Sequence, residues 1–153
     1  MGTIKQRVVA LIKKHGTNCP FKIAKGLGIQ IHYENLGSTL GYYSKHFRIP
    51  IIHINESAAE HEQKFICAHE LGHAILDPDT NTSFLKVHTF FSTDKKEREA
   101  NTFAVELLIP DEVLYEYENT NLSIYETCEI YGVSKEMATL KCFSKKGDRY
   151  GYF

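Results

Sequence analysis

Residues 64–76 read KFICAHELGHAIL and contain the most informative pattern of the chain. It belongs to a helix predicted for residues 57–76, because its apolar residues share one broad face. His69 and His73 are four residues apart on that face, so both imidazoles can reach one metal ion. Glu70 lies one position further round, where its carboxylate can lie beside the open coordination position. The pattern predicts a catalytic zinc site in which Glu70 activates a zinc-bound water.

A second predicted helix, residues 95–108, contains the candidates for the third protein ligand that a catalytic zinc needs. Glu97 and Asn101 are four residues apart and border the apolar face of this helix. We therefore prefer Glu97 as the ligand and Asn101 as a hydrogen-bond partner of a ligand imidazole. Glu99 points about 200° away from Glu97 in regular helix geometry and is the reserve candidate. The alternative is that Glu97 and Glu99 are not ligands but ordinary first-turn carboxylates, which the positive end of the helix dipole favours.

Shorter elements are predicted on both sides of these helices from apolar periodicity and turn residues. Residues 49–54 are apolar on both faces, which is typical of a central strand. Asn18 and Thr93 are the expected N-caps of the helices that follow them. The predicted strands are 30–34, 40–43 and 49–54, and the other predicted helices are 4–15, 20–25, 111–118, 123–131 and 134–143.

Length and charge restrict the class of protein. The 153 residues fit one domain, 1–153, which can bury a hydrophobic core without disulfides. The formal net charge of −1 argues against direct binding of nucleic acid. No apolar run is long enough to cross a membrane, and residues 1–14 lack the apolar core of a signal peptide. We therefore expect a cytoplasmic protein whose scattered cysteines are buried thiols: Cys19, Cys67, Cys128 and Cys142.

The histidines outside the motif are expected to be surface residues or satisfied core residues rather than metal ligands. Tyr42, Tyr43 and His88 are candidate donors to the oxyanion of a tetrahedral intermediate, and the sequence does not choose among them. The six histidines outside the motif are His15, His32, His46, His53, His61 and His88.

The chain resembles the ImmA/IrrE family of metallopeptidases over residues 18–143, most of its length. Three blocks carry the likeness, of which the first two are specific and the third is weaker. Ile109 stands where methionine is frequent before Pro110, a departure that does not touch the chemistry. The first block is 51–55 (IIHIN) with 64–73 (KFICAHELGH), the second is 97–110 (EREANTFAVELLIP), and the third is Val133-Ser134 with the helix after it.

The resemblance implies a minimal zincin-like α+β domain, with a small three-stranded sheet packed on the active-site helix and additional helices at both ends. It implies zinc as the cofactor, held by His69, His73 and Glu97, with Glu70 as the general base. Members with this compact architecture occur in phages and mobile elements, where they act as anti-repressors. The expected partner is therefore a helix-turn-helix repressor protein, which a zinc endopeptidase of this kind cleaves.

Two other functions are compatible with parts of the sequence. The first is a non-catalytic zinc-containing module that inactivates a repressor by binding it without cleavage. Structural zinc sites usually have four protein ligands, whereas the sequence offers three good ones. The second is direct DNA binding, since residues 21–28 and 133–135 faintly resemble a helix-turn-helix. The near-neutral charge argues against it, and both segments are expected to be packing helices.

Overall fold

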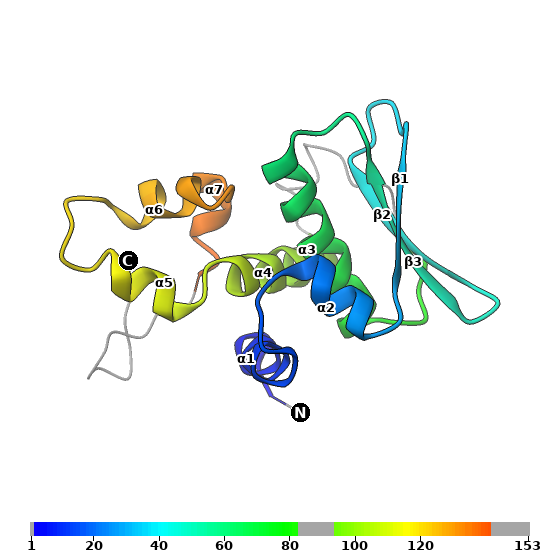
Figure 1. Ribbon diagram of the computed structural model, residues 1–153, viewed down its shortest axis with the longest axis horizontal. Coiled ribbons are helices and arrows are strands. Elements are labelled where there is room, and N and C mark those ends of the chain that lie inside the picture. The colour runs from blue at the N-terminus through cyan, green and yellow to red at the C-terminus, as the bar shows by residue number, and fades with distance from the viewer. Residues whose placement is uncertain (1, 83–93, 142–153) are drawn as a thin grey trace.

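A small mixed β-sheet and the helices packed on one of its faces form the fold, which Figure 1 shows as a computed structural model. The structure describes residues 2–82 and 94–141. This is the expected minimal zincin-like α+β architecture, with helices before and after a three-stranded sheet. The elements are α1 (Ile4–His15), α2 (Pro20–Gly26), β1 (Gln30–Glu34), β2 (Gly41–His46), β3 (Ile49–Asn55), α3 (Glu60–Leu76), α4 (Lys95–Leu108), α5 (Asp111–Glu116), α6 (Ile124–Ile130) and α7 (Lys135–Ala138).

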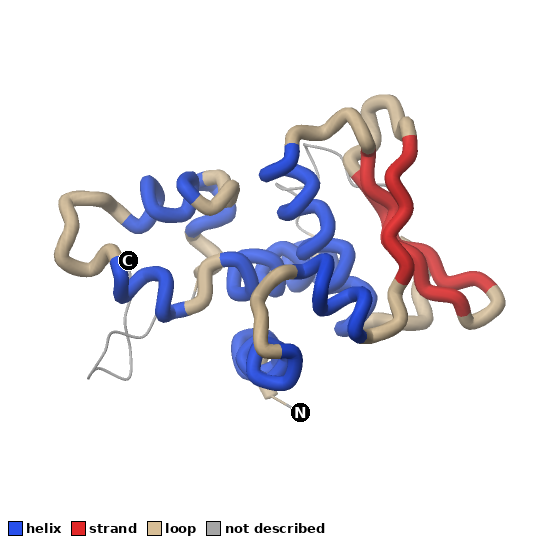
Figure 2. Tube along the Cα trace, viewed as in Figure 1, coloured by secondary structure: helices blue, strands red, loops and turns tan. Residues whose placement is uncertain are grey.

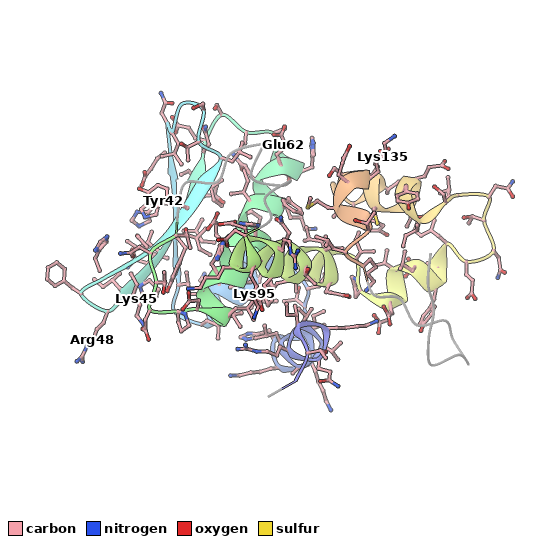
Figure 3. All side chains as sticks on the ribbon, turned by 180° about the vertical axis from the view of Figure 1, so that it is seen from behind. Tyr42, Lys45, Arg48, Glu62, Lys95 and Lys135 are labelled. Atoms are coloured by element: carbon pink, nitrogen blue, oxygen red, sulfur yellow. The ribbon has the colours of Figure 1, made fainter. Side chains whose placement is uncertain are left out.

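β3 is the central strand of the sheet, as its apolar run predicts. It pairs in parallel with β1 and antiparallel with β2, so the strand order is β1-β3-β2. β2 is longer than predicted and extends to His46, which pairs with Ile49. The turn residues Phe47 and Arg48 have left-handed backbone (φ 52° and 65°), which matches the twist of a tight hairpin. Figure 3 shows Arg48 at the end of this hairpin, away from the helices.

The two faces of the sheet have different surroundings. Ile52 and Ile54 of β3 and Tyr43 of β2 are buried against the helices. All the helices of the described residues lie on this side of the sheet (Figure 2). Because side chains alternate along a strand, His53 points to the opposite face, together with His32 of β1, its partner in the register.

α3 lies between the sheet and α4 and contacts both. On the sheet side, a Cβ atom at Gly41 would lie 2.6 Å from the His53 carbonyl oxygen and 2.6 Å from Ile66 Cγ2. On the α4 side, a Cβ atom at Gly72 would lie 3.1 Å from Phe103 Cβ. The two glycines therefore let α3 approach β2 on one side and α4 on the other.

α3 begins at Glu60 rather than at Ser57. The backbone N–H and the hydroxyl of Ser57 both donate to Asn55 Oδ1 (3.0 and 2.7 Å), which closes a turn before the helix starts. The Asn55 amide also donates to the carbonyl oxygens of Gly37 and Thr39 (2.9 Å each). This side chain therefore ties the end of β3 to the loop before β2.

The predicted N-caps of α2 and α4 also differ from those in the structure. The side chain of Asn18 donates to the Leu107 carbonyl oxygen near the end of α4 (3.1 Å), and Cys19 is the N-cap of α2. Asp94 caps α4, and its carboxylate accepts a backbone N–H of the first turn. Thr93 lies outside the described residues. Asn18 thus connects two helices that the sequence alone does not place together.

A buried ion cluster joins the end of the described chain to the helices before it. The Lys141 ammonium group lies 2.6 Å from Glu106 Oε1 on α4 and 2.9 Å from Asp111 Oδ1 on α5. Lys5 of α1 reaches the same Asp111 carboxylate at 2.9 Å. These opposite charges stabilise one another away from water and hold three helices to the segment after α7.

The last predicted helices are shorter in the structure. α5 ends at Glu116 rather than at residue 118, and α6 ends at Ile130. α7 ends at Ala138, and the predicted end of this helix at residue 143 lies outside the described residues. Among the helices of 2–82 and 94–141, none combines the length and the apolar character needed to cross a membrane.

We expect Gly41→Ala to lower the free energy of unfolding by about 2 kcal/mol or more, because the new Cβ would overlap a backbone oxygen of β3. Thermal denaturation should then show a melting temperature roughly 4–8 °C below that of the wild type. Ser38→Ala, at an exposed position in the loop before β2, is the control and should melt within about 2 °C of the wild type. An unchanged melting temperature for Gly41→Ala would contradict the close packing of Gly41 against His53 of β3 and Ile66 of α3.

Candidate metal centre

α3 holds three ionisable side chains out of contact with solvent. His69 and Glu70 are fully buried, and His73 is 5% exposed. The imidazole rings of His69 and His73 lie edge to face with centroids 4.9 Å apart, as neighbouring turns of a helix allow. One ligand atom from each of the three side chains lies within 4.8 Å of the other two. The motif therefore folds into a compact group of nitrogen and oxygen atoms.

α4 brings a fourth ionisable side chain, Glu97, into the same group. Glu97 Oε2 lies 3.0 Å from His69 Nε2, and Glu97 Oε1 lies 3.2 Å from His73 Nε2. One turn later on α4, Asn101 Oδ1 lies 2.8 Å from His69 Nδ1. Glu97 and Asn101 thus contact the motif from one face of α4, as their spacing predicts.

The proton positions in this group fit a cation between the side chains. Asn101 Oδ1 can only accept a hydrogen bond, so the proton of neutral His69 lies on Nδ1. Its Nε2 then presents a lone pair, and it faces a carboxylate oxygen of Glu97 that is also an acceptor. The two atoms lie about 3 Å apart, so a positive charge between them is favourable, either a proton on Nε2 that Glu97 accepts or a metal ion. A metal ion held by both imidazoles and by Glu97 would supply that charge.

The pKa shifts favour the protonation states that metal binding needs. Burial lowers the pKa of His69, which favours the neutral imidazole. Burial acts to raise the pKa of Glu97, but the hydrogen bonds with His69 and His73 outweigh it and lower this pKa to about 2. Neutral imidazole and ionised carboxylate are the forms that coordinate zinc.

Glu70 is buried with one oxygen paired and the other unpaired. Oε1 accepts a hydrogen bond from the Thr82 hydroxyl at 3.3 Å, whereas Oε2 has no hydrogen-bond partner within the described residues. Burial raises the pKa of Glu70 well above its usual range, and the negative charge of Glu97 adds to the effect. A buried carboxylate oxygen without a partner is costly, which is typical of a group that meets its partner only during function.

Thr82 is the residue of this centre that the sequence analysis missed. Its hydroxyl accepts from the Tyr43 N–H (2.8 Å), and its own N–H donates to the Tyr43 carbonyl oxygen (3.0 Å). Thr82 therefore extends the backbone pairing of β2 and holds Glu70 from the sheet side. It lies in a polar segment without periodicity, so no signal in the sequence predicts this contact.

The other candidates from the sequence lie elsewhere. Within the described residues, Glu99 has no hydrogen bond or ion pair with His69 or His73. The Tyr43 hydroxyl donates to the Pro78 carbonyl oxygen (2.9 Å). Tyr42 stacks on a histidine of the opposite face of the sheet, His53. The remaining candidate for the oxyanion, His88, lies outside the described residues.

Comparisons with known proteins place the chain among peptidase relatives. The profile of the IrrE N-terminal-like domain, which defines a peptidase family, matches residues 24–143. Uncharacterized immunity region protein 2 of Bacillus phage phi105 is 44% identical over 143 residues, which are 93% of this chain and 90% of the phage protein. Metallopeptidase ImmA of Bacillus subtilis (strain 168) is 38% identical over 115 residues, which are 74% of this chain and 67% of that protein.

The matched range includes α3 and α4 and therefore all the side chains of the centre described above. A family profile that covers this much of the chain, with two relatives of more than 30% identity, identifies the family. The chain belongs to the ImmA/IrrE family of metallopeptidases.

Proposed function

We propose that this protein is a zinc-dependent endopeptidase in which His69, His73 and Glu97 bind the ion and Glu70 is the general base. The observation that carries the proposal is the Glu97 carboxylate in contact with both imidazoles, at 3.0 and 3.2 Å. Two histidines and one glutamate are a ligand set of catalytic zinc, which keeps one position open for water or substrate. A structural zinc site would have a fourth protein ligand.

Zinc bound at this site would act as a Lewis acid that lowers the pKa of water and polarises the scissile carbonyl group. The chain's own residues provide the remaining steps. The Glu70 carboxylate accepts a proton from the attacking water and later delivers it to the leaving amine. Thr82 holds Glu70 Oε1 at 3.3 Å and leaves Oε2 for the proton. Asn101 keeps His69 in the tautomer whose Nε2 can bind the ion.

The proposed substrate is a helix-turn-helix repressor protein. The phage relative is named for an immunity region, and the Bacillus subtilis relative is named metallopeptidase ImmA. These names support a peptidase that acts in the control of a phage or mobile element. Cleavage of the repressor would release transcription of the element, so the protein would serve regulation rather than general protein breakdown.

We expect Glu70→Gln to abolish proteolysis while the metal content stays the same. A glutamine amide cannot accept the proton, and the loss of a general base lowers rates by at least about 100-fold. The assay incubates the protein with helix-turn-helix repressor proteins of phages and mobile elements and identifies fragments by mass spectrometry. Glu60→Gln, at an exposed position in the first turn of α3, is the control and should cleave at the wild-type rate.

Two results of this assay would contradict the proposal. Cleavage by Glu70→Gln at the wild-type rate would show that the assigned base is wrong. A repressor that stays intact with the wild-type protein but loses operator binding would favour the non-catalytic interaction module.

The pair Glu97→Gln and Glu99→Gln tests the third ligand. Both substitutions remove one negative charge from the first turns of α4, but only Glu97 contacts the imidazoles. Substitution of a residue that only supports a metal ligand typically lowers the affinity roughly 10–100-fold. We expect Glu97→Gln, which alters a proposed ligand itself, to weaken zinc binding by more than that. Glu99→Gln should bind zinc as the wild type does. Competition with a chromophoric chelator measures both affinities, and equal losses in the two variants would refute the assignment of Glu97.

Substitutions of Asn101 test its role in orienting His69. Asn101→Leu removes the acceptor of the Nδ1 proton, and we expect the affinity for zinc to fall roughly 10–100-fold. Asn101→Asp keeps an acceptor oxygen at this position and should retain most of the affinity. The same chelator competition applies, with circular dichroism to check that both variants are folded. A similar loss in both would indicate a packing effect instead of a hydrogen-bond effect.

A further inference from the structure

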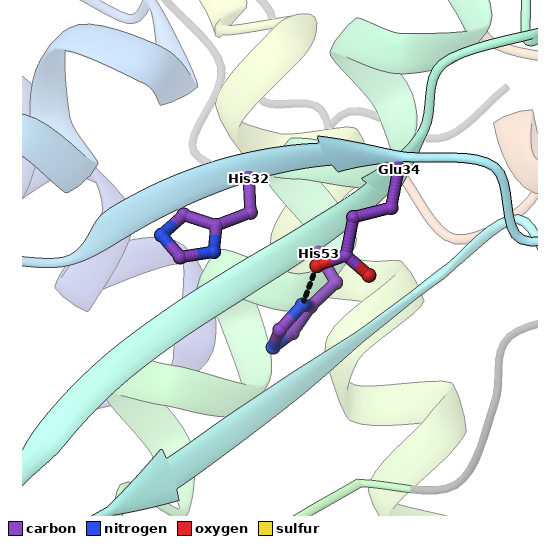
Figure 4. A group of neighbouring side chains, drawn as sticks. All are labelled: His32, Glu34 and His53. Carbon is purple, nitrogen blue, oxygen red and sulfur yellow. Dashed lines mark hydrogen bonds and ion pairs between the residues drawn. The ribbon is translucent and has the colours of Figure 1, made fainter.

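The outer face of the sheet carries a second group of metal-ligating side chains, His32, Glu34 and His53 (Figure 4). One ligand atom from each of these side chains lies within 4.8 Å of the other two. Ile52 and Ile54, the neighbours of His53 in β3, are buried on the face that packs against the helices. The second group is therefore separated from the proposed catalytic centre by the sheet itself.

Strand geometry explains why these three side chains meet. His32 and Glu34 are two residues apart in β1 and therefore point to the same face. In the parallel pairing of β1 with β3, His53 is the register partner of His32. The three side chains therefore connect β1 and β3 at the position where His32 pairs with His53.

The contacts of His53 hold its ring in a position suited to a ligand. Nδ1 lies 2.8 Å from Glu34 Oε1, and Nε2 lies 2.8 Å from the Ser44 hydroxyl oxygen. The Tyr42 ring stacks on the imidazole with centroids 4.0 Å apart and planes 9° from parallel. In the absence of an ion, Nδ1–H can donate to Glu34; with an ion bound in place of that proton, Nε2 can donate its proton to Ser44 while Nδ1 presents its lone pair to the ion. A ligand histidine in a metal site usually donates its other N–H in this way.

His32 supplies the third ligand and leaves the site accessible. Its Nε2 contacts Gln30 Oε1 at 3.0 Å, and its other ring nitrogen faces the Glu34 and His53 side chains in Figure 4. His32 is exposed and the Glu34 side chain is 37% exposed, so an ion can enter from solvent with a water as a further ligand. Bonds of about 2.1 Å from zinc to tetrahedral ligands place the ligand atoms roughly 3.4 Å apart. The ligand atoms of His32, Glu34 and His53 lie within 4.8 Å of one another, a range that includes this spacing.

We propose that His32, Glu34 and His53 form a second, ancillary binding site for a divalent transition-metal ion of the zinc type. Two imidazoles and one carboxylate favour zinc and similar ions over calcium or magnesium, which prefer oxygen ligands. An ion bound here joins β1 to β3 and stabilises the sheet on which α3 packs. The proposal does not depend on the proposed peptidase activity, because it uses other residues on another face.

The same residues also contain a Ser44–His53–Glu34 chain of hydrogen bonds, which has the order of a hydrolase triad. Ser44 is only 4% exposed and lies within the paired strands β2 and β3. A substrate carbonyl group therefore cannot approach its hydroxyl group. The arrangement favours a metal site in which Ser44 orients the imidazole of His53.

The test counts zinc ions bound by the full chain. The protein is stripped with a chelator, titrated with Zn²⁺ and analysed by calorimetry and by elemental analysis after gel filtration. We expect two equivalents for the wild type, one for His32→Ala, and two for the control His46→Ala, an exposed histidine of β2 outside the group. The proposal would be overturned if the wild type bound one equivalent of Zn²⁺ and His32→Ala bound the same amount. It would also be overturned if His32→Ala still bound two equivalents.

Two further measurements separate this site from the catalytic centre. In Glu97→Gln, which lacks a proposed catalytic ligand, Zn²⁺ should still shift the imidazole ¹⁵N resonances of His32 and His53. The combined variant Glu97→Gln/His32→Ala should lose the shift of His53. Unchanged resonances of both histidines in Glu97→Gln at saturating Zn²⁺ would overturn the ancillary site, whatever the outcome for peptidase activity.

Discussion

The contact of the Glu97 carboxylate with the imidazoles of His69 and His73 joins α3 to α4 at the candidate metal centre. It places two imidazole nitrogens and a carboxylate together in a region that water hardly reaches. Ionisable groups in such surroundings are costly unless an opposite charge compensates them. The fold therefore holds the proposed ligands in a preorganised arrangement at the interface of α3 and α4, which suits the binding of a cation.

The packing around this contact keeps the arrangement rigid. Gly72, inside the histidine motif, lets α4 approach α3 until a Cβ atom would lie 3.1 Å from Phe103. Asn101 fixes the tautomer of His69 from α4, and Thr82 holds Glu70 from the edge of β2. The proposed ligands and the proposed base thus lie on regular helices, whose positions are more precise than those of loop residues. Within the described residues Glu70 Oε2 has no hydrogen-bond partner, which fits the proposed role of Glu70 as the base.

β3 connects the two metal sites proposed for this chain. Its residues Ile52 and Ile54 pack toward the helices, and His53 points to the outer face. An ion that joins β1 to β3 would therefore strengthen the sheet against which α3, the helix of the catalytic centre, is packed. This connection is mechanical, because side chains of one strand alternate between the faces without touching one another.

Features that depend on neighbours along the chain were predictable from the sequence. His69, Glu70 and His73 come together through the repeat of one helix, and Glu97 and Asn101 through that of another. The central position of β3 followed from its apolar composition. Which helix faces contact one another depends on tertiary packing. It brought Glu97 rather than Glu99 to the imidazoles, and it joined Thr82 to Glu70. It also set β1 in parallel register with β3, so that His32 and His53 became neighbours. Helix and strand periods orient side chains locally, whereas contacts between distant segments depend on how the whole core packs.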